Sequence, residues 1–169
     1  MKLKGFFRNL MIVFILVLNF SCDQITKTIV RKTVAEYEII PLIDGYLTLT
    51  KVENTGAFLS AGSSLPYFIR FLVLTLLPIV FLSYGLYLII RKKELPQILI
   101  IAWCFVIGGG IGNLYDRIVH GSVTDFLHLD LGLFQTGIFN MADVSIMTGM
   151  FIIIWRQFLI GINQNSKGD

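Results

Sequence analysis

Charged residues, cysteines and histidines are all scarce in this 169-residue sequence. Charge accounts for only 15% of the residues, whereas 55% are hydrophobic and the mean hydropathy is +0.76. So little polar surface cannot cover a soluble globule of this size, which indicates an integral membrane protein. The net positive charge of +3 comes from cations at the ends of apolar runs, where they determine membrane topology, so we expect no nucleic-acid partner.

The few cysteines and histidines argue against several kinds of site. Cys22 and Cys104 lie far apart in apolar surroundings, so they predict buried free thiols and neither a disulfide framework nor a metal site. His120 and His128 lie in one short segment without the His-Glu-x-x-His spacing of a zinc protease. We therefore expect neither a metal ion nor another cofactor.

Long apolar runs are abundant, and four of them can cross a bilayer. They predict a mainly α membrane protein with transmembrane helices over residues 6–30, 65–90, 95–114 and 140–160, in one domain formed by residues 1–169. Ser63 and Ser64 are expected to cap the second helix, with Pro66 in its first turn.

Cations cluster before the first run and between the second and third runs. The positive-inside rule then places both termini and the turn between helices two and three in the cytoplasm. These cations are Lys2, Lys4 and Arg8, followed by Arg91, Lys92 and Lys93. The two other connections, residues 33–62 and 115–139, are expected to face outward.

The first outward connection, residues 33–62, has a β-strand composition. Residues 37–43 and 46–52 are rich in β-branched and aromatic residues, and Asp44-Gly45 between them is a strong hairpin signal. We expect a small extracytoplasmic β element there, followed by an irregular segment in which Gly56 allows the backbone to turn. The second connection, residues 115–139, is expected to be an outward loop.

The amino terminus resembles a secretory signal peptide ending before Cys22, which suggests a lipoprotein cleavage site. Asn19, however, stands where an aliphatic residue is expected, and three further spanning segments follow. An uncleaved first helix is the preferred interpretation.

A glycine-rich run precedes the second outward connection. It fits neither of the nucleotide-binding patterns GxGxxG and GxxxxGK[ST]. Gly108 and Gly112 instead form a GxxxG pair, which allows two membrane helices to approach closely. Such packing would fix the direction of Asn113 and Arg117, which lie one turn apart on one face.

Ionisable residues at membrane depth are costly, so they are functional candidates. Asp23 has Lys27 one helical turn away, whereas the pairing of Asp116 with its neighbour Arg117 stays open because adjacent positions do not face each other.

Asp125 and Asp143 have no evident local cation, and both can reach one interfacial layer. Two carboxyl groups forced together share a proton at neutral pH, which supplies one base and one acid. The spacing therefore allows aspartyl protease chemistry, but structural carboxylates or an ion pathway remain alternatives.

Other membrane hydrolases fit less well. A serine protease needs a base beside its serine, and Ser145 has no neighbouring histidine. Tyr115-Asp116 matches half of the presenilin-type pattern, but the Gly-x-Gly-Asp half is missing. A small transporter or channel with aspartates as an ion relay is the main non-hydrolase alternative, and a structural membrane protein is the other. A relay predicts polar residues through the bilayer depth, whereas here they gather near one surface.

Four ordered motifs across nearly the whole chain closely resemble those of the lipoprotein signal peptidase (signal peptidase II) family. The only small departure is a single alanine before Phe58, where many members have two. The matching motifs are Asp23-Gln24-x-Thr26-Lys27, Asn54-Thr55-Gly56-Ala57-Phe58, Gly112-Asn113-x-x-Asp116-Arg117 with Gly121-x-Val123-x-Asp125-Phe126, and Phe139-Asn140-x-Ala142-Asp143.

The resemblance implies that Asp125 and Asp143 are the catalytic dyad. The matching residues expected to support the site or contact substrate are Asp23, Lys27, Asn54, Gly56, Asn113, Asp116, Arg117 and Asn140. We expect the amides and Arg117 to donate hydrogen bonds to substrate carbonyls or the lipid ester region, and Asp23 with Lys27 to hold the first helix.

The resemblance also implies the substrate and the location. The substrate would be a bacterial prolipoprotein with a diacylglyceryl-modified cysteine, cut just before that cysteine. The outward β element, with Phe58 near its end, would cover the lipidated peptide. The enzyme would lie among the lipids of the bacterial cytoplasmic (inner) membrane, with its active site near the outer face. Nothing in the sequence demands more than a monomer.

Overall fold

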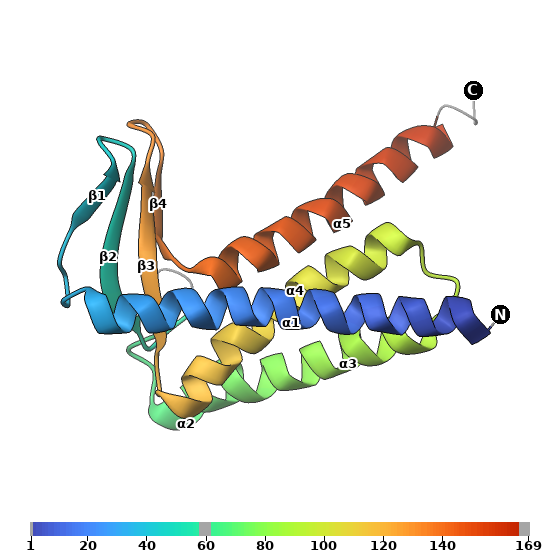
Figure 1. Cartoon of the computed structure of the whole chain (residues 1–169), viewed down its shortest axis with the longest axis horizontal. Helices are drawn as coiled ribbons and strands as arrows, with labels where there is room; N and C mark the ends of the chain where they lie inside the picture. Colours follow the sequence, from blue (N-terminus) through green and yellow to red (C-terminus); the bar gives the residue numbers. More distant parts are fainter. Residues whose placement is uncertain (1, 58–61, 166–169) are drawn as a thin grey trace.

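The computed structural model describes residues 2–57 and 62–165 of the chain. Four helical segments are long and apolar enough to cross a membrane, as predicted, and they cover Gly5–Thr33, Tyr67–Arg91, Gln97–Val119 and Met141–Ile162. A four-stranded antiparallel sheet stands across one end of the helices, and both termini lie at the other end (Figure 1). The mainly α membrane fold with a small β element is confirmed.

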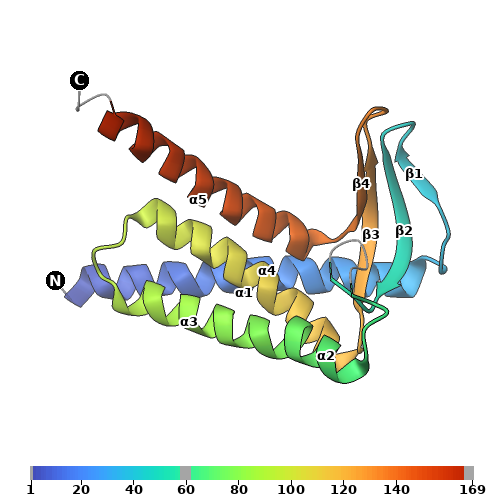
Figure 2. The same ribbon diagram turned by 180° about the vertical axis from the view of Figure 1, so that it is seen from behind.

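The helices end one to five residues beyond the predicted limits, whereas the second, third and fourth begin one or two residues later than predicted. They are α1 (Lys2–Thr33), α2 (Tyr67–Phe71), a π-helical turn η2 (Leu72–Leu76), α3 (Leu77–Arg91), α4 (Gln97–Val119) and α5 (Met141–Asn165). Figure 2 shows α4 between α3 and α5 and against α1. Helix α4 is the central helix, since 44% of its most apolar stretch is buried, against 22% or less in the other spans.

Glycines allow α4 to pack closely on its neighbours, as the GxxxG pair predicts. A Cβ atom added at Gly108 would lie 2.8 Å from the Cβ of Asn19 on α1. One added at Gly112 would lie 2.5 Å from Oδ2 of Asp23. Larger residues would therefore push α1 away from α4 and open the polar cluster described below.

The strands follow the order β1 (Ile40–Ile43), β2 (Leu47–Asn54), β3 (Val123–Asp130) and β4 (Gln135–Phe139). The hairpin turn predicted at Asp44-Gly45 is present, with Gly45 at a φ of 76°. The first strand is shorter than predicted. Tyr37 has a φ of 60°, which is incompatible with a strand, so β1 begins only at Ile40.

The prediction of a loop over residues 115–139 is wrong. Helix α4 continues to Val119, and β3 and β4 then form a second hairpin that completes the sheet. The polar residues made this stretch look irregular, but several are satisfied inside the fold. Thr124, for example, is fully buried, and its hydroxyl donates to Glu53 at 2.7 Å.

The expected cap of the second helix is also wrong. The helix begins at Tyr67, and Pro66, without a side-chain hydrogen bond, is the N-cap residue in place of Ser63 or Ser64. Proline fixes its own φ and has no backbone N–H to satisfy, so the start of this helix does not depend on a serine hydroxyl. Phe58, which was expected to lie near the end of the β element, is outside the described part of the chain.

Candidate active site

The sheet and α5 together bring Asp125 and Asp143 to one place. Asp125 lies in β3, a strand paired on both sides, and not in a loop as predicted. Strand β4 ends at Phe139, and Asn140 alone connects it to α5, whose first turn carries Asp143. The backbone on both sides of the site is therefore fixed by regular hydrogen bonding.

Asn140 links the two aspartates directly. Its side-chain Nδ2 donates to Oδ1 of Asp125 at 2.6 Å. Its backbone N–H donates to Oδ2 of Asp143 at 3.1 Å, while its own Oδ1 accepts from the Asp143 N–H at 3.0 Å. The last two bonds form a reciprocal cap at the start of α5. One buried asparagine thus caps a helix and holds both carboxyl groups.

Two further amides occupy the remaining carboxylate oxygens. Asn54, at the end of β2, donates to Oδ2 of Asp125 at 2.9 Å. Asn113, on α4, donates to Oδ1 of Asp143 at 2.8 Å. Among the described residues no ion pair includes either aspartate. Arg117 and Lys27 therefore act on the two carboxyl groups only through longer-range charge interactions.

The surroundings of Asp125 disfavour its charged form. The side chain is 5% exposed, and burial raises its pKa to about 6. The hydrogen bond from Asn54 lowers the pKa, the nearby Asp143 carboxylate raises it, and the bond from Asn140 lowers it. Asp125 can therefore gain and lose a proton near neutral pH.

A buried ionic cluster lies next to the two aspartates. The predicted pair of Lys27 with Asp23 is present at 2.8 Å, and Lys27 also pairs with Asp116 at 2.9 Å. All three side chains are fully buried. Asp116 makes its second ion pair with Arg31 at 3.0 Å and none with its neighbour Arg117.

The cluster is joined to the aspartates through Asn113. The Lys27 ammonium donates to Oδ1 of Asn113 at 2.9 Å, and the amide of Asn140 donates to the same oxygen at 3.2 Å. Because two donors face this oxygen, the NH₂ group of Asn113 must point toward Asp143. Lys27 therefore sets the orientation of a group that binds the candidate dyad.

Arg117 connects α4 to the segment after β2. It donates to the carbonyl oxygen of Gly56 at 2.9 Å and to that of Asn113 at 3.3 Å. Gly56 donates its own N–H to Oδ1 of Asn54 at 2.9 Å, which closes the turn predicted there. Within the fold, Asn113, Asn140 and Arg117 donate to carboxylates, to an amide oxygen and to backbone carbonyls. Their contact with substrate stays a prediction.

Three residues that the sequence analysis left out belong to the same region. Arg31 donates to the Thr124 hydroxyl at 2.7 Å, and this hydroxyl donates to Glu53 at 2.7 Å. The spacing contained a signal for Arg31, since it follows Lys27 by one helical turn and so shares its face. No local sequence pattern indicates that Thr124 and Glu53 are in contact, because they become neighbours only through the pairing of β2 with β3.

A metal-dependent site finds no support in the described residues. Across residues 2–57 and 62–165, no group of three or more His, Cys, Asp or Glu side chains could hold a metal ion. The geometry instead offers two carboxyl groups at one end of the helices, linked by amides and able to share a proton.

Comparison with known proteins identifies the family. The family model described as signal peptidase (SPase) II matches residues 14–159, which include every site residue named above. The chain belongs to the signal peptidase II family. Membership in this family makes the chain a membrane peptidase and not a transporter or channel with an ion relay.

Relatives with the name "lipoprotein signal peptidase" match over most of their length. One from Azoarcus sp. (strain BH72) is 34% identical over 86% of this chain and 81% of its own. One from Desulforapulum autotrophicum is 36% identical over 80% of this chain and 84% of its own. One from Syntrophus aciditrophicus is 31% identical over 78% and 82%.

Two solved structures described as bacterial membrane enzymes share this signal peptidase II fold. One superposes with a TM-score of 0.80 at 26% identity and covers 90% of each chain. The other has a TM-score of 0.78 at 27% identity and covers 87% of this chain and 92% of its own. The sheet and the helices of this chain are therefore those of an experimentally known membrane enzyme architecture.

Proposed function

We propose that Asp125 and Asp143 are the catalytic pair with which this signal peptidase II removes the signal peptide from prolipoproteins. The observation that carries the proposal is the double contact of Asn140. It holds one carboxyl group through its side chain and the other through its backbone. Such an arrangement keeps two carboxyl groups close to each other without a direct ion pair, and acid–base catalysis by a shared proton requires this proximity.

The reaction begins with one ionised and one protonated carboxyl group. The ionised group takes a proton from water, whose oxygen attacks the scissile carbonyl, while the protonated group donates to the carbonyl oxygen. The tetrahedral intermediate then collapses. Its C–N bond breaks as one carboxyl group of the pair donates a proton to the leaving amine. A hydroxyl of the intermediate returns a proton to the other carboxyl group, which restores the pair and releases the new carboxyl terminus. No covalent enzyme intermediate forms.

The remaining site residues hold this pair in place. Asn54 and Asn113 keep the outer carboxylate oxygens oriented, and Lys27 with Asp23 and Asp116 fixes Asn113 from below. Arg117 and Gly56 keep the segment after β2 beside the pair. Such rigid support matters because small displacements of catalytic groups lower the rate strongly.

The substrate in this proposal is a prolipoprotein that already carries diacylglycerol on its cysteine. The enzyme acts as a monomeric single domain in the bacterial inner membrane, with both termini in the cytoplasm and the sheet with the aspartates at the outer face. The cluster Arg91, Lys92 and Lys93, at the end opposite the sheet, supports this orientation.

Cleavage of a defined substrate tests this function. The purified full chain is incubated in detergent with a diacylglyceryl-modified prolipoprotein, and the products are weighed by mass spectrometry. The expected product begins with the lipidated cysteine, and an unmodified precursor of the same sequence is cut far more slowly. Cleavage at another bond, or equal rates on both precursors, would contradict the proposal.

A further inference from the structure

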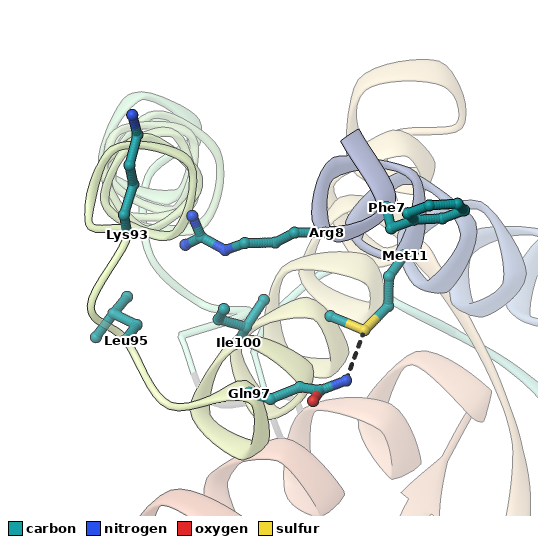
Figure 3. A pocket seen from close by; sticks show the side chains of 7 residues that line it. All are labelled: Phe7, Arg8, Met11, Lys93, Leu95, Gln97 and Ile100. Atoms are coloured by element: carbon teal, nitrogen blue, oxygen red, sulfur yellow. Dashed lines mark hydrogen bonds between the residues drawn. The ribbon is translucent and has the colours of Figure 1, made fainter. Parts of the chain in front are cut away.

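A cavity of about 470 Å³ opens at the end of the molecule opposite the sheet. It lies between the first turns of α1 and the turn that joins α3 to α4 (Figure 3). Arg8, Lys93 and Gln97 supply its polar lining, and Leu95 and Ile100 are among its apolar residues. None of these residues takes part in the candidate active site.

Arg8 reaches across this cavity with much of its hydrogen-bonding capacity unused. Its Nη2 donates to the carbonyl oxygens of Ile89 and, at 2.8 Å, of Lys92, which end α3. Its Nε is buried without a hydrogen-bond partner in the described part of the chain. The ion pairs found there do not include Arg8. The guanidinium is therefore a cation without a carboxylate, beside a cavity.

The rest of the lining suits a molecule with a charged and an apolar part. Lys93 adds a second cation on the other side of the cavity (Figure 3). The amide of Gln97 is engaged only with the thioether of Met11 at 3.5 Å, which is a weak bond. Ile100, only 3% exposed, belongs to the apolar part of the lining.

The position of the cavity identifies the chemistry of its occupant. Arg8 lies close to the start of the first span at Gly5, and Lys93 lies between spans that end at Arg91 and begin at Gln97. Cations at span ends lie at the level of phospholipid phosphates, and cationic residues there attract anionic lipid. We propose that this cavity binds an anionic glycerophospholipid, with its phosphate between Arg8 and Lys93 and its glycerol and first acyl carbons against Leu95 and Ile100.

Such a lipid would join α1 to the α3–α4 turn, which Arg8 already connects through the end of α3. The proposal concerns the opposite end of the molecule from the aspartates, so it does not depend on their catalytic role.

Lipid binding is measured by native mass spectrometry on the delipidated full chain in non-ionic detergent. The probes are phosphatidylglycerol and phosphatidylcholine with identical acyl chains, and glycerol 3-phosphate tests whether a soluble phosphate suffices. We expect one phosphatidylglycerol to bind at least about tenfold more tightly than phosphatidylcholine, since each interfacial cation contributes about fivefold. Lys93→Gln should lower this preference about fivefold.

Lys32→Gln is the matched control, because Lys32 is an exposed lysine in the last turn of α1, at the sheet end. It should leave the preference unchanged. Arg8→Gln should also lower the preference about fivefold, but it removes bonds to α3 as well, so exposed Lys93 provides the decisive variant. Equal affinity for both lipids, an equal loss in Lys32→Gln, or full displacement by equimolar glycerol 3-phosphate would overturn the proposal.

Discussion

Replacing Lys27 by methionine should both destabilise the protein and slow cleavage. Methionine has nearly the length of lysine, so packing is kept while the charge and three donors are lost. Asp23 and Asp116, both fully buried, then face each other, and of the ion pairs among the described residues only that of Asp116 with Arg31 remains. Removing one partner of a buried ion pair costs about 3–5 kcal/mol, so we expect a loss of that size in the free energy of unfolding.

The loss of Lys27 should slow cleavage for a different reason, namely its effect on Asn113. Without Lys27, Oδ1 of Asn113 loses its charged donor at 2.9 Å, and the amide group can turn away from Asp143. A hydrogen bond to a charged group contributes about 1.5–3 kcal/mol, which corresponds to a rate loss of about ten- to hundredfold. Stability is measured by denaturant unfolding in micelles and the rate by cleavage of a lipidated prolipoprotein.

A double variant separates the two effects. Lys27→Met with Asp23→Asn leaves one buried anion, Asp116, opposite Arg31, so the charges balance again. More than half of the lost unfolding free energy should return, while cleavage stays slow because Asn113 still lacks its donor. A single variant within about 0.5 kcal/mol of wild type, or a double variant with full activity, would refute this reasoning.

Three further changes have defined outcomes. Gly109→Ala puts a methyl group against the Ala142 carbonyl oxygen and should lower the unfolding free energy by about 1–3 kcal/mol. Gly161→Ala is the control, because no atom lies within 4 Å of the added methyl group, and it should leave the unfolding free energy unchanged. Equal melting temperatures of the two variants would contradict this prediction. Because the pKa of Asp125 is raised to about 6, its contribution to stability is complete below its unfolded pKa of 3.8 and is lost as pH rises through 6. Asp125→Asn should therefore gain about 2 kcal/mol relative to wild type between pH 4 and pH 7 in paired unfolding curves, and a constant difference would contradict this. Asn54→Leu removes a hydrogen bond that lowers the pKa of Asp125, so the midpoint of that carboxyl group's titration should move to higher pH and not to lower.

The sequence predicted the membrane fold well because its signals are local. Apolar length alone identifies the spans, and Asp44-Gly45 specifies its hairpin within a few residues. The spacing of Asp23 and Lys27 likewise predicted their ion pair. These features need no knowledge of the remaining chain.

The errors concern features that depend on distant residues. Strand β3 is stabilised by β2, which lies far from it in sequence, so the polar stretch around Asp125 read as a loop. No local pattern shows that Asn113 and Asn140 each face a carboxylate, so these contacts were not predicted. Helix α4 extends beyond its predicted end because Lys27 on α1 neutralises the charge of Asp116.

The rate of signal-peptide removal by Asp125→Asn, Asp143→Asn and the double variant tests the proposed dyad most directly. Each single variant keeps the shape of the side chain but removes its ability to exchange a proton. Residues that act as one catalytic unit lose activity non-additively, so each single variant should fall by at least about a thousandfold and the double variant little further. Processing of a lipidated prolipoprotein at near wild-type rate by either single variant would contradict the dyad.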